Sequence, residues 1–369
     1  MLNRERLLEN FLNLLTIEGP SFNEHLVAEN VLAQLEALQV RAAMDGTGEA
    51  IGGNCGNIVG RLEPTPPGNE WIGLVTHMDT VEADHPVVPR VEGGIIRSEG
   101  NTILGADDRA GIAALLEALT VVREQGLPHA GLELIFTVAE EQGLKGVRYL
   151  ETGELRSPLA FVLDSSGPPG RIVTRAPYHN RLEWTITGKA AHAGVSPESG
   201  IDALKAAALG ISLMKLGRID PETTANLGLI QGGKATNIVC ERVEIHGETR
   251  SLDKAKMKAE TEHMLASMQE GAGKVGAKVE ERVILQYEGY DLGPHEPVVQ
   301  MALGAVERAG LKAQVTSTGG GSDASVLNAK GIKSVVLGVG YKNPHSVDEE
   351  ISLVDLESLA RIVLELIRR

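Results

Sequence analysis

The chain has 369 residues, which suggests two or three domains and allows a sizeable core. Its 35 basic and 50 acidic residues give a formal net charge of −15, which argues against nucleic-acid binding. Two cysteines, Cys55 and Cys240, are too few for a disulfide framework, so we expect both to be reduced in a cytoplasmic protein.

The first part of the chain alternates helix and strand patterns. Apolar residues at helical spacing predict helices over Arg4–Leu15, Glu24–Leu38 and Asp108–Arg123. Short apolar runs predict strands at Asn57–Leu62, Trp71–Val75, Leu132–Ala139 and Leu159–Leu163. This alternation is typical of an α/β fold, with a mainly parallel sheet covered by helices. No apolar run approaches the roughly 18 residues that a membrane span needs, so no membrane partner is expected.

The pattern changes at residue 177, and a smaller α+β domain is predicted over residues 177–290. Its strands alternate apolar and polar residues, as strands with one exposed face do. The expected strands are Arg181–Thr187 and Val243–Thr249, and the expected helices are Ile201–Leu216 and Lys254–Met268.

The α/β pattern resumes over residues 291–369. Helices are predicted at Val298–Ala309 and Leu353–Ile367, and a strand at Lys333–Val339. Residues 1–176 and 291–369 are therefore expected to form one discontinuous domain, into which the smaller domain is inserted.

Two adjacent glutamates, Glu140 and Glu141, stand at the end of the apolar run Leu132–Ala139. Two carboxylates at the end of a buried strand repel each other unless a positive group lies between or beyond them. A divalent metal ion is the simplest such group: one glutamate would bind it and the other would take a proton from water. Polar residues are also common at exposed strand ends, and for this pair alone that alternative stays open.

A second motif, Thr76-His77-Met78-Asp79, ends the run Trp71–Val75. Residues i and i+2 of a strand share a face, so His77 and Asp79 should point the same way. The other ring nitrogen of a metal-binding histidine is usually held by a carboxylate. The motif could supply a ligand and its orienting group, although a lone His-x-Asp is more often a capped loop.

Acidic or imidazole groups accompany further predicted elements. Asp107 opens a helical stretch, Asp164 ends a strand, and His345 follows the strand at Lys333–Val339; Asp108 is expected to be a helix cap. Ligands of open α/β sheets bind beyond the carboxyl ends of the strands. Five candidate ligands would therefore meet in one crevice: His77, Asp107, Glu141, Asp164 and His345. Two imidazoles and three carboxylates suit two divalent ions, with Zn²⁺ as first choice and Mn²⁺ or Co²⁺ as alternatives.

Nine short motifs occur in order along nearly the whole chain: THMDTV, LGADDRAGIA, TVAEEQG, FVLDSSG, GKAAHAGVSPESG, GGKATNIV, GETRS, GGGSDASVLNAKG and HSVDEE. They resemble those of the co-catalytic zinc metallopeptidases, which include peptidase T, glutamate carboxypeptidase, acetylornithine deacetylase and succinyl-diaminopimelate desuccinylase. The peptidase T-like branch is the nearest match. The tripeptidase of that branch has an arginine before the glycine block, where this chain has Thr318, which argues against strict tripeptide specificity.

The resemblance implies a role for each candidate ligand. Asp107 would bridge two metal ions. His77 and Asp164 would complete one site, and Glu141 and His345 would complete the other.

It also implies the roles of the neighbouring residues. Asp79 would support His77, Glu140 would be the general acid/base, and the Asp107-Asp108 peptide bond would be cis. The discontinuous domain would be catalytic, and the inserted domain would form a homodimer.

Substrate-holding residues are implied in and near the inserted domain. By resemblance, His192 would reach the active site of the partner subunit and polarise the scissile carbonyl. Arg250 would hold a substrate carboxylate, with Asn237 helping and the backbone at Gly320 and Gly321 close to the ligand. From the residues alone, His192 could instead be structural and Arg250 an ordinary charge at a strand end.

The resulting prediction is a metal-dependent exopeptidase acting on short peptides, in which Glu140 activates water between the ions. A deacylase of N-acyl amino acids with the same chemistry is the alternative. A metal- or peptide-binding protein without catalysis is the third hypothesis, and it is disfavoured because every required residue is present.

Overall fold

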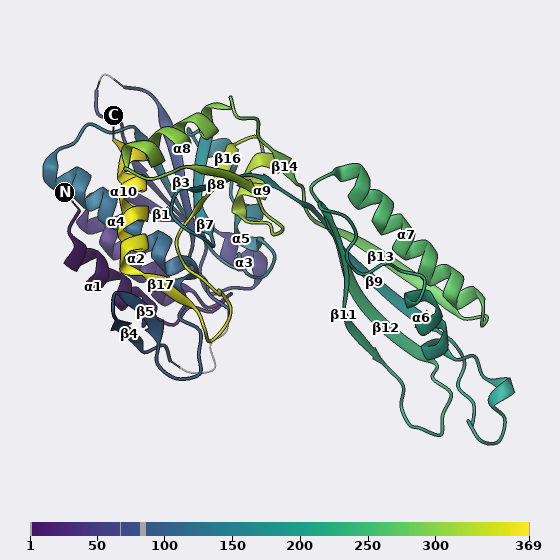
Figure 1. Cartoon of the computed structure of the whole chain (residues 1–369). Helices are drawn as coiled ribbons and strands as arrows, with labels where there is room; N and C mark the ends of the chain where they lie inside the picture. Colours follow the sequence, from purple (N-terminus) through teal and green to yellow (C-terminus); the bar gives the residue numbers. More distant parts are fainter. Residues whose placement is uncertain (1, 67, 82–85, 369) are drawn as a thin grey trace. The chain divides into compact units, whose positions relative to one another are not determined.

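The computed structural model describes residues 2–66, 68–81 and 86–368 (Figure 1). Contacts between residues divide the chain into two compact units. Unit 1 comprises Met1–Arg175, Asp291–Thr318 and Ser322–Arg369, and unit 2 comprises Ala176–Tyr290 and Gly319–Gly321.

The main sheet of unit 1 is mixed. In the described part of the chain its strand order is β1-β2-β6-β3-β7-β16-β8-β14, and β15 also pairs with β8. The strands are β1 (Arg41–Met44), β2 (Ile58–Leu62), β3 (Trp71–His77), β6 (Gly131–Thr137), β7 (Leu159–Ser165), β8 (Arg171–Ala176), β14 (Tyr290–Asp291), β15 (Gln314–Ser317) and β16 (Lys333–Gly338).

The four central strands β6, β3, β7 and β16 are parallel, whereas β1, β2 and β8 pair antiparallel with their inner neighbours. His77, the last residue of β3, lies opposite Thr137, the last residue of β6. Each residue of β6 is buried, as expected for a central strand covered on both faces. The carboxyl ends of these strands therefore meet at one edge of the sheet.

Helices cover this sheet: α1 (Arg4–Leu15), α2 (His25–Ala37), α3 (Thr47–Ile51), α4 (Ala106–Gln125), α5 (Lys145–Tyr149), α8 (Pro297–Arg308), α9 (Asp323–Ala329) and α10 (Leu353–Ile367), with a 3-10 turn at Thr152–Glu154. Helix α4 packs against β3, β7, α1 and α10 and is buried on nearly every side. Asn3 caps α1 by accepting the N–H groups of Glu5 and Arg6, and Phe11 lies on its buried face. A small sheet joins β4 (Pro89–Glu92), β5 (Ile95–Ser98) and β17 (Glu350–Ser352).

Unit 2 is an antiparallel sheet with two helices packed against it (Figure 1). Its strand order is β10-β11-β12-β9-β13. The strands are β9 (Tyr178–Thr187), β10 (Gly217–Arg218), β11 (Thr223–Gly232), β12 (Arg242–Ser251) and β13 (Lys278–Tyr287), and the helices are α6 (Ala203–Ile211) and α7 (Lys254–Gly273), with a 3-10 turn at Pro197–Ser199. Trp184 and Ile245 alternate with exposed or half-buried residues and help build the core between sheet and helices.

Helix α6 is shorter than the sequence pattern predicts. It begins at Ala203 because Asp202 caps it by accepting two backbone N–H groups, and it ends at Ile211. The two helices approach closely: a Cβ atom at Gly271 of α7 would lie 2.2 Å from the backbone nitrogen of Gly210. A larger residue at either position would push the helices apart.

The α/β class with an added α+β unit is confirmed by this architecture. The expectation of a mainly parallel sheet holds for the central strands, and the flanking strands make the whole sheet mixed. In the described residues, no helix is both long enough and apolar enough to span a membrane.

Candidate metal centre and active site

The five candidate ligands gather at the carboxyl edge of the central strands in unit 1. His77 ends β3, Glu141 lies four residues beyond the end of β6, and Asp164 lies near the end of β7. His345 follows β16, and Asp107 lies in the first turn of α4. The parallel register of the strands thus brings together residues up to 268 positions apart in the sequence.

Asp107 lies between the two imidazoles. Its Oδ1 atom is 3.1 Å from Nε2 of His77, and its Oδ2 atom is 3.4 Å from Nε2 of His345. The second imidazole also lies 2.7 Å from Oε1 of Glu141, and the first lies 3.8 Å from Oδ1 of Asp164. One carboxylate therefore faces both histidines, each through a different oxygen atom.

Acidic groups are crowded together at this site. Burial raises the pKa of Asp164 well above its usual range, and the charge of Asp107 adds to this shift. Burial and the charge of Asp164 do the same to the pKa of Glu140. Hydrogen bonds that His345 donates to the carboxylates of Asp107 and Glu141 raise its pKa to about 10. The raised pKa values of the buried carboxyls and of the imidazole both indicate that added positive charge would stabilise this site.

These residues fit divalent metal ions. Ligand atoms of His77, Asp107 and Glu141 all lie within 4.8 Å of one another, so one ion could contact all three. Imidazole nitrogens with carboxylate oxygens are donors that Zn²⁺ and its neighbours in the first transition row accept. The described residues thus include a possible metal site. Its nitrogen and oxygen donors suit a divalent ion, and the positive charge of such an ion would offset the crowded carboxylates.

Asp79 holds the loops around this site together. The Nδ1 atom of His77 lies 2.9 Å from the backbone oxygen of Asp79 and 3.4 Å from its Oδ1 atom. The same carboxylate accepts the backbone N–H groups of Glu140 at 3.0 Å and Glu141 at 3.2 Å, and the hydroxyl of Ser21 at 2.7 Å. Asp79 is fully buried, so its contacts fix the His77 ring and the glutamate pair relative to each other.

The turn before Glu140 has an unusual backbone. Ala139 has a φ of 47°, in the left-handed region that favours glycine. Its N–H group donates to Oε1 of Glu24 at 2.9 Å, and Glu24 is fully buried. Burial and the charge of Asp79 raise the pKa of Glu24 to about 7. Glu140, which follows this turn, is only 9% exposed.

The Asp107-Asp108 peptide bond is cis, as the motif resemblance implies. The Asp108 carboxylate accepts the N–H group of Gly111 at 3.3 Å and the Thr76 hydroxyl, so it caps α4 as expected from its position. The preceding residue, Asp107, faces the two histidines.

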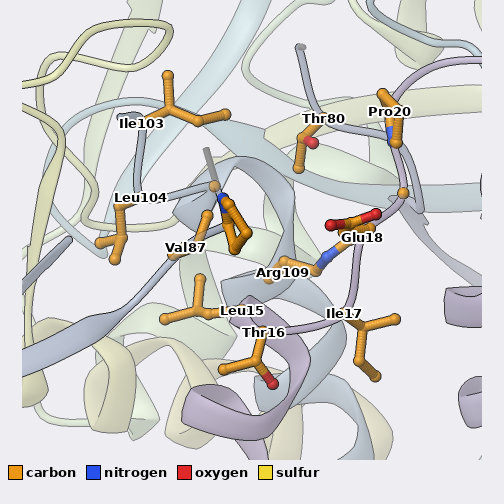
Figure 2. Close-up of a pocket in the computed structure, with 13 residues that line it drawn as sticks. Leu15, Thr16, Ile17, Glu18, Pro20, Thr80, Val87, Ile103, Leu104 and Arg109 are labelled. Carbon is orange, nitrogen blue, oxygen red and sulfur yellow. The ribbon is translucent and has the colours of Figure 1, made fainter. Parts of the chain in front are cut away.

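A pocket of about 310 Å³ lies beside these loops (Figure 2). Leu104, Gly105 and Arg109 line it, together with residues of the segment after α1. The buried Arg109 guanidinium donates to the backbone oxygen of Met78, and burial lowers its pKa to about 10. None of the five candidate ligands lines this pocket, so it is distinct from the candidate metal centre.

The other predicted substrate residues belong to unit 2. His192 is exposed, and its Nδ1 atom accepts the N–H group of Gly194 at 3.2 Å. The backbone oxygen of Asn237 accepts the N–H group of Ala193 at 2.9 Å. The structure thus brings His192 and Asn237 together on one loop pair of unit 2.

Arg250 is engaged within unit 2. Its Nε and NH2 groups donate to the two oxygens of Glu248 at 2.9 and 3.0 Å, and NH1 lies 3.3 Å from the Tyr287 hydroxyl. NH1 also lies 3.4 Å from the backbone oxygen of Gly319, beside predicted residues Gly320 and Gly321. A Cβ atom at Gly321 would lie 2.4 Å from the Tyr287 ring, so only glycine fits there. All three nitrogens of the Arg250 guanidinium thus have partners within unit 2, so Arg250 does not present a free fork.

Several supporting residues escape sequence reasoning. Glu24 stands at the start of α2 and looks like an ordinary helix-start acid, yet it holds Ala139. Asp323 of α9 accepts the Thr137 hydroxyl at 2.6 Å, at the end of β6. Tyr341 donates its hydroxyl to Asp164 at 3.3 Å. Glu349 lies within the motif HSVDEE, which is the sequence signal that could have pointed to it. Nothing in that motif distinguishes Glu349 from Glu350.

The chain is similar to known peptidases over its full length. Residues 73–369 match the peptidase family M20/M25/M40. A Bacillus subtilis (strain 168) protein, YqjE, is 39% identical over 100% of this chain and 99% of its own length. The solved structure of the aminopeptidase PepT from Bacillus cereus ATCC 10987 has a TM-score of 0.92 at 38% identity, covering 99% of this chain and 98% of that one. A tripeptidase from Staphylococcus aureus Mu50 has a TM-score of 0.95 at 38% identity, covering 100% and 98%.

Proposed function

Because the chain belongs to the peptidase family M20/M25/M40 and is a hydrolase of peptide bonds, we propose that two divalent ions at the carboxyl edge of the unit 1 sheet serve its reaction. The observation that carries the proposal is the position of Asp107, with one carboxylate oxygen facing His77 and the other facing His345. A carboxylate placed in this way suits a bridge between two ions.

The remaining ligands divide around that bridge. His77 and Asp164 would hold one ion with Asp107, and Glu141 and His345 would hold the other. Zn²⁺ is the first candidate, with Mn²⁺ and Co²⁺ as alternatives. When bound, the ions supply Lewis acidity toward the amide carbonyl and toward the attacking water.

Glu140 acts as the general acid/base in this proposal. Its carboxyl is close enough to the candidate ligands for the charge of Asp164 to raise its pKa, and its backbone is held by the bond to Asp79. In its ionised form it accepts a proton from water as the oxygen attacks the amide carbonyl. It then gives that proton to the leaving amine, which balances the reaction.

Unit 2 holds the substrate. Arg250 binds the free carboxylate of a short peptide, with Asn237 and the backbone at Gly320 and Gly321 contributing. His192 donates a hydrogen bond to the carbonyl oxygen as negative charge develops on it. We assign His192 to the active site of a partner subunit, so the enzyme works as a homodimer.

Exposed apolar residues support a dimer through unit 2. Val195, Leu229, Ile230 and Ile238 are 76%, 66%, 57% and 39% exposed, and all four belong to this unit. Large apolar side chains in contact with water favour association with another protein surface. The two free cysteines are consistent with a cytoplasmic location, which forms part of the same proposal.

A substrate panel tests the proposed function. The protein loaded with Zn²⁺ or Mn²⁺ is assayed against dipeptides, tripeptides, C-terminally amidated peptides and N-acetyl amino acids. Faster turnover of free-acid peptides supports the peptidase. Preference for N-acetyl amino acids supports the deacylase instead, and no turnover of either class by fully loaded protein would contradict catalysis.

A further inference from the structure

Glu349 connects two loops that carry candidate ligands. Its Oε2 atom accepts the backbone N–H groups of Leu104 at 2.9 Å and Gly105 at 2.7 Å. Its Oε1 atom accepts the N–H group of Asp107 at 3.1 Å. The side chain is 2% exposed, so these bonds form away from water. A buried carboxylate with three backbone donors is a strong, geometrically defined contact.

The backbone that receives Glu349 is shaped for a carboxylate. Gly105 has a φ of 76°, in the left-handed region. Successive N–H groups around a left-handed residue converge and form a concave site for an anion. The loop from Leu104 to Asp107 is thus folded around the Glu349 carboxylate.

The other end of this contact is equally fixed. Glu349 directly precedes β17, whose residue Ile351 pairs with Ile96 of β5. The backbone groups of Lys342 and Glu350 also bond to each other, and they close the loop that carries His345. Glu349 therefore anchors the His345 loop to the Asp107 loop, 242 residues away in the sequence.

We propose that Glu349 is a positioning residue that sets the distance between Asp107 and His345, and so determines the affinity of the ion site formed by these two residues with Glu141. This inference rests on the proposed dinuclear centre. Glu349 acts through the backbone of Asp107 and the fold of its own loop. Outer groups that orient metal ligands commonly change metal affinity about 10- to 100-fold when removed.

Glu349→Gln is the decisive variant. Glutamine has nearly the same shape, but one of its two oxygens becomes an NH₂ group that cannot accept the backbone N–H groups. At least one of the three bonds is lost, and two donors then face each other. Glu350→Gln is the matched control, because the adjacent Glu350 carboxylate pairs with Arg97 and Lys342 instead of with the backbone of the Asp107 loop.

The experiment compares metal binding by wild type and variants. Metal-free proteins are titrated with Zn²⁺ against a chromophoric chelator, and with Co²⁺ while the visible absorption spectrum is recorded. Thermal unfolding of the metal-free proteins shows whether each variant is folded. We expect Glu349→Gln to lose affinity about 10- to 100-fold for one of the two ions and to change the Co²⁺ spectrum. The Glu350→Gln protein should match wild type, and excess metal should restore peptide turnover to Glu349→Gln.

Other results would overturn the inference. A folded Glu349→Gln protein with wild-type affinity for both ions and a wild-type Co²⁺ spectrum contradicts it, as does an equal loss in Glu350→Gln. If Glu349→Gln does not fold, Glu349→Asp decides: its shorter side chain should weaken one ion site, and wild-type affinity would refute the role. The wild-type titration separately tests the dinuclear proposal. If wild type binds no ions, both fail; if wild type binds two and the variants match it, only the Glu349 inference fails.

Discussion

The carboxylate of Asp79 accepts the backbone N–H group of Glu140 at 3.0 Å, joining two motifs that lie 61 residues apart in the chain. The same carboxylate accepts the N–H group of Glu141. Because His77 also contacts Asp79, one buried acid fixes a candidate ligand from β3 and two glutamates from the end of β6. The Asp79 carboxylate thus holds the backbone of both glutamates, so the difference between their roles must come from their side chains.

Glu141 is expected to bind metal. Its Oε1 atom lies 2.7 Å from the Nε2 atom of His345, so both side chains face the same space. Glu141→Ala should bind fewer ions per chain than wild type, with at least about a 100-fold loss of affinity at one site. Elemental analysis after dialysis measures the ion content. Wild-type content in the variant would remove Glu141 from the ligand set.

Arg250 is expected to bind a substrate carboxylate. Arg250→Ala should raise KM for free-acid peptides roughly 10- to 100-fold and leave C-terminally amidated peptides nearly unchanged, because only the free acid makes the charged hydrogen bond. Arg242→Ala is the control, since Arg242 lies on the same strand and pairs with Glu244 at the surface. Equal losses on both kinds of peptide would instead assign Arg250 a structural role with Glu248 and Tyr287.

Sequence periodicity predicted the elements that have one clear apolar face or that are fully buried. The helices Arg4–Leu15 and Leu353–Ile367 begin and end as predicted, and Leu159–Leu163 lies within β7. By contrast, β13 was missed because its sequence, KVEERVILQY, is largely exposed and carries charges that mask the alternation. Family membership, read from the ordered motifs, is confirmed by the match over residues 73–369.

Contacts between distant backbone groups could not be predicted in the same way. Strand-end position was enough to nominate His77 and Asp164, because parallel strands bring their ends together. No local pattern tells that Glu24 reaches Ala139, or that Glu349 and not Glu350 enters the Asp107 loop. These contacts depend on how loops pack against one another. No fixed spacing of residue types along the sequence marks which side chain reaches which loop.

Glu248 should make unit 2 more stable near neutral pH than in acid. A hydrogen bond from His179 lowers the pKa of Glu248 to about 2. Arg250 adds to this shift, and burial opposes it. A carboxyl with a lowered folded-state pKa stabilises the fold above its usual value of about 4.5, and that contribution is lost as the pH falls toward 2. Because the side chain is 33% exposed, solvent screening reduces the effect to about 1 kcal/mol.

Urea unfolding followed by Trp184 fluorescence in a Trp71→Phe background measures this effect, since Trp184 lies in the core of unit 2. Wild type should exceed Glu248→Gln in stability at pH 6, and the difference should shrink at pH 3. Glu244→Gln, at a half-buried position on the same strand, should show no such trend. A difference that stays constant between the two pH values would contradict the argument.

His192 is expected to act across a dimer. Inactive His192→Ala and inactive Glu140→Ala subunits are mixed and allowed to exchange, and mass spectrometry confirms that mixed dimers form. A hybrid has one active site with Glu140 intact that receives His192 from the other chain, so part of the activity should return. If hybrids form and remain inactive, His192 acts within its own subunit or takes no part in catalysis.

Glu140→Ala tests the central claim most directly, because ion content and peptide turnover are measured on the same preparation. Glu140 is proposed to move the proton of the attacking water and not to hold an ion. The variant should keep close to the wild-type ion content and lose turnover of free-acid peptides by at least about 100-fold. Unchanged turnover with both ions bound would contradict the proposed mechanism, and loss of the ions would make Glu140 a ligand instead of the acid/base.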